Sequence, residues 1–153
     1  MMERVALKLG MEIDREMKLM SEQWVEWKPV DGLSQKYYIE SISDVLDGFR
    51  IVLSDADKEE NKVNVIFENS VHAYRSTDES FRQSTINILD EAYGTQFYSE
   101  WTFFKVVNSE YMKWLSVQSY NIIDSESLIH FSFFAVDSIV DVIAAYEPKV
   151  ELL

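Results

Sequence analysis

Residues 101–116, which read WTFFKVVNSEYMKWLS, carry the strongest indication of the fold. As a strand, residues 101–107 place Trp101 and Phe103 on one face and Phe104 and Val106 on the other. Large apolar side chains on both faces are typical of an interior strand that helices cover on at least one side. The stretch therefore predicts a sheet that is buried at its centre, with core packing as the favoured role of its aromatic side chains.

The second half of this stretch predicts a short helix over SEYMKWLSVQ, residues 109–118. Tyr111, Trp114 and Leu115 stand at i, i+3 and i+4, so they form one stripe that we expect to face inward. Trp101 and Trp114 are nevertheless candidate partner-binding residues, because a half-exposed tryptophan at the end of an element can anchor an interface.

Further strands are predicted on both sides of this stretch, where β-branched and aromatic residues are frequent and several segments alternate between apolar and polar. They cover residues 36–43, 48–55, 62–68, 71–75 and 128–136, and a short last strand covers 149–153. The dipeptide Asp47-Gly48 is a hairpin signal. Because the connections are short, at least part of the sheet is expected to be antiparallel.

The clearest helical pattern is STDESFRQSTINILDEAYG, residues 76–94, in which Ser76 and Glu79 form a capping box. Gly94 stands where a helix would end. The apolar stripe of this helix, which is expected to lie on a sheet, comprises Phe81, Thr85, Ile88, Leu89 and Ala92.

The sequence predicts the secondary structure of two other segments less clearly. Apolar residues at steps of three and four predict a helix over residues 12–24. Asp137 can cap a helix over DSIVDVIAAY (137–146), although the β-branched content of that segment makes a strand the competing interpretation. Together the elements predict an α+β fold with a single domain over 1–153 and a ragged start over 1–11. We expect a mainly antiparallel sheet with helices packed on it.

The composition narrows the classes of function. The chain of 153 residues has a net charge of −13. It contains no cysteine, and this absence excludes disulfides and thiolate chemistry. Such a negative charge argues against binding to nucleic acid or an anionic membrane and suits a basic protein partner, although solubility alone explains it equally well. No membrane span and no signal peptide are predicted, so we expect a cytoplasmic protein.

No motif for catalysis, a metal or a cofactor is recognisable, and a non-enzymatic protein is expected. His72 and His130 stand in predicted strands without metal-ligand spacing. Arg75 and Arg82 flank the predicted helix start, where they could bind an anion but more readily pair with Asp78, Glu79 or neighbouring acids.

The segment DADKEENK (55–62) begins like a calcium loop, but the glycine and the last glutamate of such a loop are absent. It is expected to be a solvated loop. Its four acids, which are also the candidate contact with a basic partner, are Asp55, Asp57, Glu59 and Glu60.

Three stretches carry a resemblance to a known group of proteins: FENSVHAYRSTDES (67–80), FYSEWTFFKVVNSEYMKWLS (97–116) and YEPKVEL (146–152). In them the chain resembles small acidic bacterial immunity proteins, which are encoded beside secreted polymorphic toxins. The resemblance covers about residues 36–152 and implies a protein that binds and blocks a toxin domain. It assigns a role to no individual residue.

Two other classes of function stay open at this point. One is a small-molecule-binding or regulatory module with an aromatic-lined pocket between sheet and helices. The other is an enzyme that uses paired carboxylates brought together by the fold.

Overall fold

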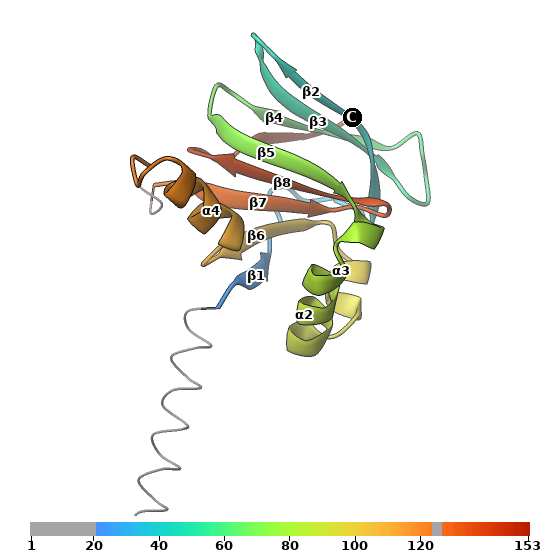
Figure 1. The fold of residues 1–153 in the computed structure, drawn as a ribbon. Helices are drawn as coiled ribbons and strands as arrows, with labels where there is room; N and C mark the ends of the chain where they lie inside the picture. The colour runs from blue at the N-terminus through green and yellow to red at the C-terminus, as the bar shows by residue number, and fades with distance from the viewer. Residues whose placement is uncertain (1–20, 124–126) are drawn as a thin grey trace, which may run out of the picture.

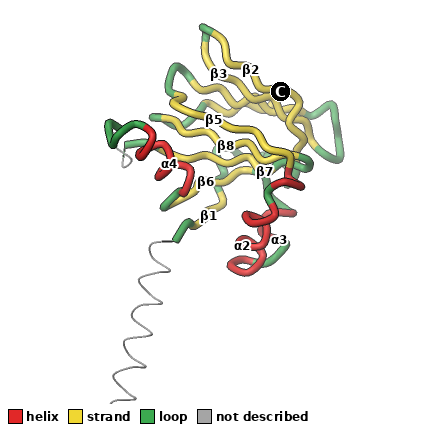
Figure 2. Tube along the Cα trace, viewed as in Figure 1, coloured by secondary structure: helices red, strands yellow, loops and turns green. Residues whose placement is uncertain are grey.

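The computed structural model describes residues 21–123 and 127–153, which form two antiparallel sheets (Figure 1, Figure 2). The five-stranded sheet has the order β1 (Gln23–Glu26), β6 (Phe103–Val107), β7 (Ile129–Phe134), β8 (Ser138–Ala144) and β5 (Val71–Asp78). The four-stranded sheet has the order β2 (Tyr37–Val45), β3 (Gly48–Asp55), β4 (Lys62–Phe67) and β9 (Lys149–Leu152). The predicted α+β class with mainly antiparallel pairing is confirmed, with two sheets where one was expected.

Aromatic side chains fill the space between the two sheets. Phe131 and Phe133 of β7 point toward the four-stranded sheet, and the ring of Phe131 lies 5.5 Å from that of Phe67 in β4. Trp27, which follows β1, has its ring 4.9 Å from Phe131 and 6.2 Å from Phe103. Edge-to-face contacts of this kind stabilise a core beyond the burial of area alone.

The helices cover the other face of the five-stranded sheet. Leu89 of α2 (Gln83–Tyr93), with Phe97 and Tyr98 of α3 (Gln96–Ser99), packs on Phe104 and Phe134 of the sheet. Further along the same face, Tyr111 and Met112 of α4 (Glu110–Gln118) pack on Ile143 of β8. β6 is therefore buried on both faces, by the second sheet and by helices, as its two-faced apolar pattern predicted.

The helix predicted over 137–146 is wrong, and the competing strand interpretation is correct. Residues Ser138–Ala144 form β8 between β7 and β5. Val140 and Val142 point into the space between the sheets, whereas Ile139 and Ile143 face the helices. Because both faces of β8 are buried, the sequence shows a continuous apolar run in place of an alternation.

The capping box at Ser76 and Glu79 is also wrong. Ser76 lies inside β5, opposite Val140, and the strand continues to Asp78. The carboxylate of Asp78 caps a short 3₁₀ turn, η1 (Glu79–Phe81), by accepting from the backbone N–H of Ser80 at 2.9 Å.

Helix α2 consequently begins later than predicted, at Gln83, and ends at Tyr93, with Gly94 as the expected C-cap. Gly94 has a φ of 85°, which glycine adopts without strain. Of the predicted stripe only Leu89 is buried; Ile88 is 53% exposed and Phe81, in η1, is 82% exposed.

The helix predicted over 12–24 is wrong at its end, since Gln23 and Trp24 belong to β1 and pair with Val107 and Val106. Its part before residue 21 lies outside the described residues. The other predicted strands are observed within a few residues of their predicted bounds. The helix after β6 is observed too, with the hydroxyl of Ser109 accepting from the N–H of Met112 as its N-cap.

Two tryptophans test this account of the core. Trp27→Ala empties a site among three phenylalanine rings and is expected to lower the free energy of unfolding by about 3–5 kcal/mol. Trp114→Ala, at a side chain that is 54% exposed, is expected to change it by less than about 0.5 kcal/mol. Urea denaturation of both variants measures the difference; equal losses would contradict the assignment of Trp27 to the core.

Candidate functional site

A cluster of polar residues is buried between the helices on the outer face of the five-stranded sheet. Its centre is Asp141 of β8, which is fully buried and lies opposite Ser132 on β7 and Arg75 on β5. The hydroxyl of Ser132 is also buried and has no hydrogen-bond partner among the described residues. The strand register therefore concentrates polar groups in an otherwise apolar layer.

Two arginines compensate the buried carboxylate. Nε of Arg75 and a terminal nitrogen of Arg82 each lie 2.9 Å from Oδ2 of Asp141. The guanidinium of Arg75 also lies 4.2 Å from the ring centre of Tyr111, which brings α4 into the cluster. The prediction that both arginines pair with acids holds, but their partner is Asp141 and not Asp78 or Glu79.

His130 connects Asp141 to the start of α4. Its Nε2 lies 2.7 Å from Oδ1 of Asp141, and its Nδ1 lies 2.6 Å from Oγ of Ser109. Because Oγ of Ser109 already accepts from the N–H of Met112, its own hydrogen can be donated to Nδ1. Nε2 of His130 then donates to Asp141, and the polar atoms of Ser109 and His130 are satisfied.

The order Ser109–His130–Asp141 has the connectivity of a hydrolase triad, but its surroundings differ from one. Ser109 is only 4% exposed and its oxygen is engaged as the helix cap. A triad must also stabilise an imidazolium during the reaction, and here two guanidinium groups already face the single carboxylate. The arrangement therefore holds α4, β7, β8 and β5 together.

Burial is the largest influence on the pKa of Asp141 and would raise it. The contacts with His130, Arg75 and Arg82 outweigh burial and hold the pKa of this carboxyl far below its usual value of 3.8.

A half-buried lysine, Lys36, joins the two sheets at one end. Its Nζ donates to the backbone oxygens of Tyr98 at 2.6 Å, Trp101 at 2.9 Å and Phe134. Burial lowers the pKa of Lys36 to about 7, an effect that the nearby carboxylate of Glu79 opposes. Lys36 thus ties the start of β2 to α3, to the residues before β6 and to the end of β7.

The residues predicted from sequence to bind a partner fall into two groups. Asp57, Glu59 and Glu60 are exposed in the β3–β4 loop. Trp101 lies at the same end of the molecule, because Lys36 contacts both: its backbone oxygen accepts from the N–H of Ala56 in the loop, and its Nζ donates to the backbone oxygen of Trp101. Trp114 is on α4, which Figure 1 draws at the opposite end of the sheets from this loop.

The structure changes the expectation for three of these residues. Asp55 is only 6% exposed, and its carboxylate accepts from the hydroxyl of Ser34 and the backbone N–H of Asp57, so it shapes the loop. Trp101 is half-buried and donates from its indole to the backbone of Trp27 at 3.2 Å. Trp114 does not face inward, as its stripe predicted, but is half-exposed.

Carboxylates from several connections gather at the end that holds Lys36. The backbone N–H of Glu79 donates to the carbonyl of Asp137, and Val136 donates to the carbonyl of Tyr37, which brings the end of β5 and the β7–β8 turn beside the start of β2. We call this surface the acidic end; its acids are Asp57, Glu59, Glu60, Asp78, Glu79, Glu100 and Asp137. Of the bases at this end, Lys36 is turned into the protein, whereas Lys58 in the β3–β4 loop and Lys28 beside Trp101 are exposed.

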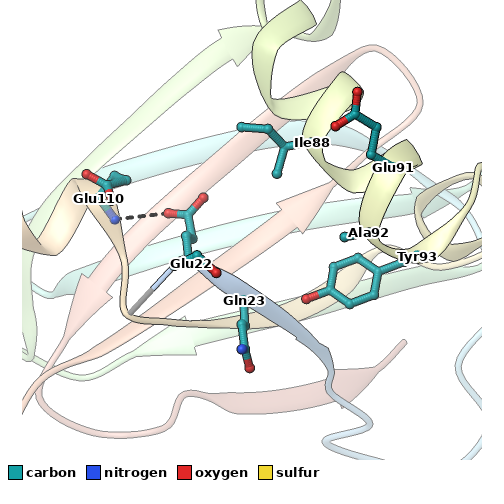
Figure 3. A pocket seen from close by; sticks show the side chains of 8 residues that line it. Glu22, Gln23, Ile88, Glu91, Ala92, Tyr93 and Glu110 are labelled. Atoms are coloured by element: carbon teal, nitrogen blue, oxygen red, sulfur yellow. Dashed lines mark hydrogen bonds between the residues drawn. The ribbon is translucent and has the colours of Figure 1, made fainter. Parts of the chain in front are cut away.

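A groove of about 780 Å³ lies where β1, α2 and the start of α4 meet (Figure 3). The backbone N–H of Glu110 donates to the carboxylate of Glu22 at 3.0 Å, and Glu91 stands across the groove on α2. Sequence reasoning missed this site, because its residues come from three elements with no common spacing. Its lining comprises Ser21, Glu22, Gln23, Ile88, Glu91, Ala92, Tyr93 and Glu110.

Comparisons with known proteins give no family for this chain: no protein-family model, curated protein or solved structure matches it. Within residues 21–123 and 127–153, none of the helices has the length and apolar content needed to cross a bilayer. The same residues contain no group of three or more histidines and carboxylates arranged to hold a metal ion.

Asp141→Asn tests the buried cluster. The substitution leaves two guanidinium groups without a counter-charge and is expected to lower the free energy of unfolding by about 3–5 kcal/mol. Asp47→Asn, in the exposed β2–β3 turn, is the control and is expected to have almost no effect. Chemical denaturation at neutral pH measures both, and a small loss in Asp141→Asn would contradict the proposed role of the cluster.

The depressed pKa of Asp141 also predicts a pH dependence. The unfolded chain binds a proton at this carboxyl near pH 3.8, whereas the folded protein does so only at lower pH. The stabilisation by Asp141 is therefore complete above pH 3.8 and declines as the pH falls below it. Unfolding free energies at descending pH should fall more steeply for the native chain than for Asp141→Asn; parallel curves would refute this assignment.

The assignment of Ser109 as a helix cap has its own test. Ser109→Ala is expected to lower the free energy of unfolding by about 1–2 kcal/mol, because it removes the cap. The native chain is expected to remain unlabelled by a fluorophosphonate probe under conditions in which a serine hydrolase reacts completely. Labelling of the native chain that disappears in Ser109→Ala would instead identify an activated nucleophile.

Proposed function

We propose that this protein is a non-enzymatic binding protein of the cytoplasm that neutralises a basic toxin domain by forming a complex with it. The observation that carries the proposal is the acidic end, where exposed carboxylates surround a base that is turned inward. Such a surface attracts a cationic partner at long range and accelerates its association.

The disposition of positive charges supports this proposal. Arg75 and Arg82 are held by Asp141, and four of the described lysines pair with neighbouring glutamates. In the described part of the chain, the bases without an ion pair are Lys28, Lys36, Arg50 and Lys58. Many more carboxylates lack one, so the surface of the described part is strongly negative.

A nuclease fits the toxin best, because a protein that binds nucleic acid presents a basic surface to the phosphates. The acidic end would occupy that surface and compete with the substrate. Immunity proteins, which the chain resembles over about residues 36–152, neutralise toxins by such complexes. The pocket that a small-molecule-binding module would need has less support, since Phe103, Phe131 and Phe133 pack together as core.

Co-expression with the protein encoded beside its gene tests the proposed function. Cells that express a toxic neighbouring domain should survive when this chain is present, and the two proteins should co-purify. Continued cell death without a complex would overturn the proposal.

Charge variants test which surface is used. Neutralising the β3–β4 loop with Asp57→Asn, Glu59→Gln and Glu60→Gln is expected to slow association with the captured toxin domain about tenfold at low salt and to weaken the salt dependence of the rate. The control removes as many exposed charges from the end of β2, the β2–β3 turn and the β4–β5 turn through Asp44→Asn, Asp47→Asn and Glu68→Gln. Equal effects of the two sets, measured by stopped flow, would contradict docking at the acidic end.

A further inference from the structure

We propose that the groove between β1, α2 and α4 binds a basic amphipathic segment of a protein partner, with a lysine or arginine between its carboxylates and an apolar side chain on its floor. This inference rests on the proposed function, because it names a second contact for the same toxin domain. It concerns a different surface from the acidic end and is tested separately.

The carboxylates of the groove favour a ligand with a positively charged side chain. Glu22, Glu91 and Glu110 contribute three carboxylates, and none of the lining residues within 21–123 and 127–153 is basic. Glu110 pairs with Lys113 at 3.0 Å across the exposed side of α4, outside the lining of the groove. A cationic side chain that enters would meet the carboxylates of Glu22 and Glu91, which form no ion pair with any described residue and stand on opposite sides of the groove (Figure 3).

The floor of the groove provides apolar contact. Ile88 is 53% exposed although it belongs to a helix whose next residue, Leu89, is buried in the core. Ala92 follows one helical turn later, and the ring of Tyr93 closes that end (Figure 3). Covering these side chains would remove apolar area from water, which a purely ionic contact cannot do.

The walls of the groove are held in place before any ligand binds. The hydroxyl of Tyr93 on α2 accepts from the backbone N–H of Trp24 on β1 at 3.1 Å. Glu22 accepts from the backbone N–H of Glu110 at the start of α4 and from the indole of Trp24 at 3.3 Å. All three elements are thus joined by hydrogen bonds around the groove, so little ordering is required when a segment binds.

The test uses the full chain with isotope-labelled methyl groups and three synthetic 18-residue peptides. The first is an amphipathic helix of Lys and Leu, the second carries Glu in place of Lys, and the third keeps Lys but replaces Leu with Ser. The methyl signals of Ile88 and Ala92 should shift with the first peptide and not with the second. The third should bind at least tenfold more weakly, because it cannot cover the apolar floor.

Variants locate the binding site. Glu91→Gln is expected to weaken binding of the Lys/Leu peptide about two- to fivefold and Ile88→Ser about tenfold. The matched controls, Asp47→Asn and Val45→Ser, remove an exposed charge and an exposed apolar side chain from the β2–β3 hairpin and should leave the affinity unchanged.

Several results would overturn the inference. One is a shift confined to the acidic end, and another is equal weakening by the control variants. A third is a large gain in affinity when residues 1–20 are deleted, which would identify the chain's own N-terminal residues as the occupant. Protection from the toxin in co-expression, together with no shift of Ile88, would reject the groove and leave the proposed function standing.

Discussion

The carboxylate of Asp141 is the interaction on which the arrangement of the helices depends. It is fully buried, and isolated burial of a charge is so unfavourable that the surrounding structure must compensate it. Compensation comes from Arg75 on β5, from Arg82 just before α2 and from His130 on β7, which in turn contacts the cap of α4. A single side chain thereby holds together three strands and the starts of two helices. The apolar contacts of the same face would tolerate many helix positions, whereas these hydrogen bonds accept very few.

The same interaction affects the outer surface. Each arginine that pairs with Asp141 is a positive charge that no longer balances exposed acids. The ammonium group of the half-buried Lys36 is likewise turned inward, toward three backbone oxygens. The same ion pairs that compensate the buried carboxylate of Asp141 therefore also leave the exposed acids without positive partners. A net charge of −13 costs stability through self-repulsion, and a partner of opposite charge would relieve that repulsion on binding.

A feature of the structure could be predicted from the sequence when it depends on residues that are near one another in the chain. The β2–β3 hairpin follows from the Asp47-Gly48 turn, and β4 follows from the alternation of Val63, Val65 and Phe67. Helix α4 follows from the helical spacing of Tyr111, Trp114 and Leu115, whereas its cap at Ser109 is seen only in the structure. The choice between helix and strand for the β8 segment could not be made from the sequence, because a strand that is buried on both faces shows no alternation of apolar and polar residues. The Asp141 cluster was missed for a stronger reason: its arginines lie 59 and 66 residues away in the chain, and only the pairing of β5 with β8 brings them together. The groove likewise exists only where β1, α2 and α4 meet.

Helix α2 connects the two surfaces that we propose bind a partner. Its eleven residues span about 16 Å, with the acidic end at its start and the groove along its last two turns. Two apolar side chains, Phe81 before the helix and Ile88 within it, are exposed along this path. Asp78 and Glu79 precede Phe81 in the chain, and Glu91 follows Ile88 by about one helical turn. An apolar centre with a charged rim is the usual composition of a specific interface. A partner of ordinary domain size could cover both surfaces at once, so the charges would govern the rate of encounter while Phe81 and Ile88 would prolong the lifetime of the complex.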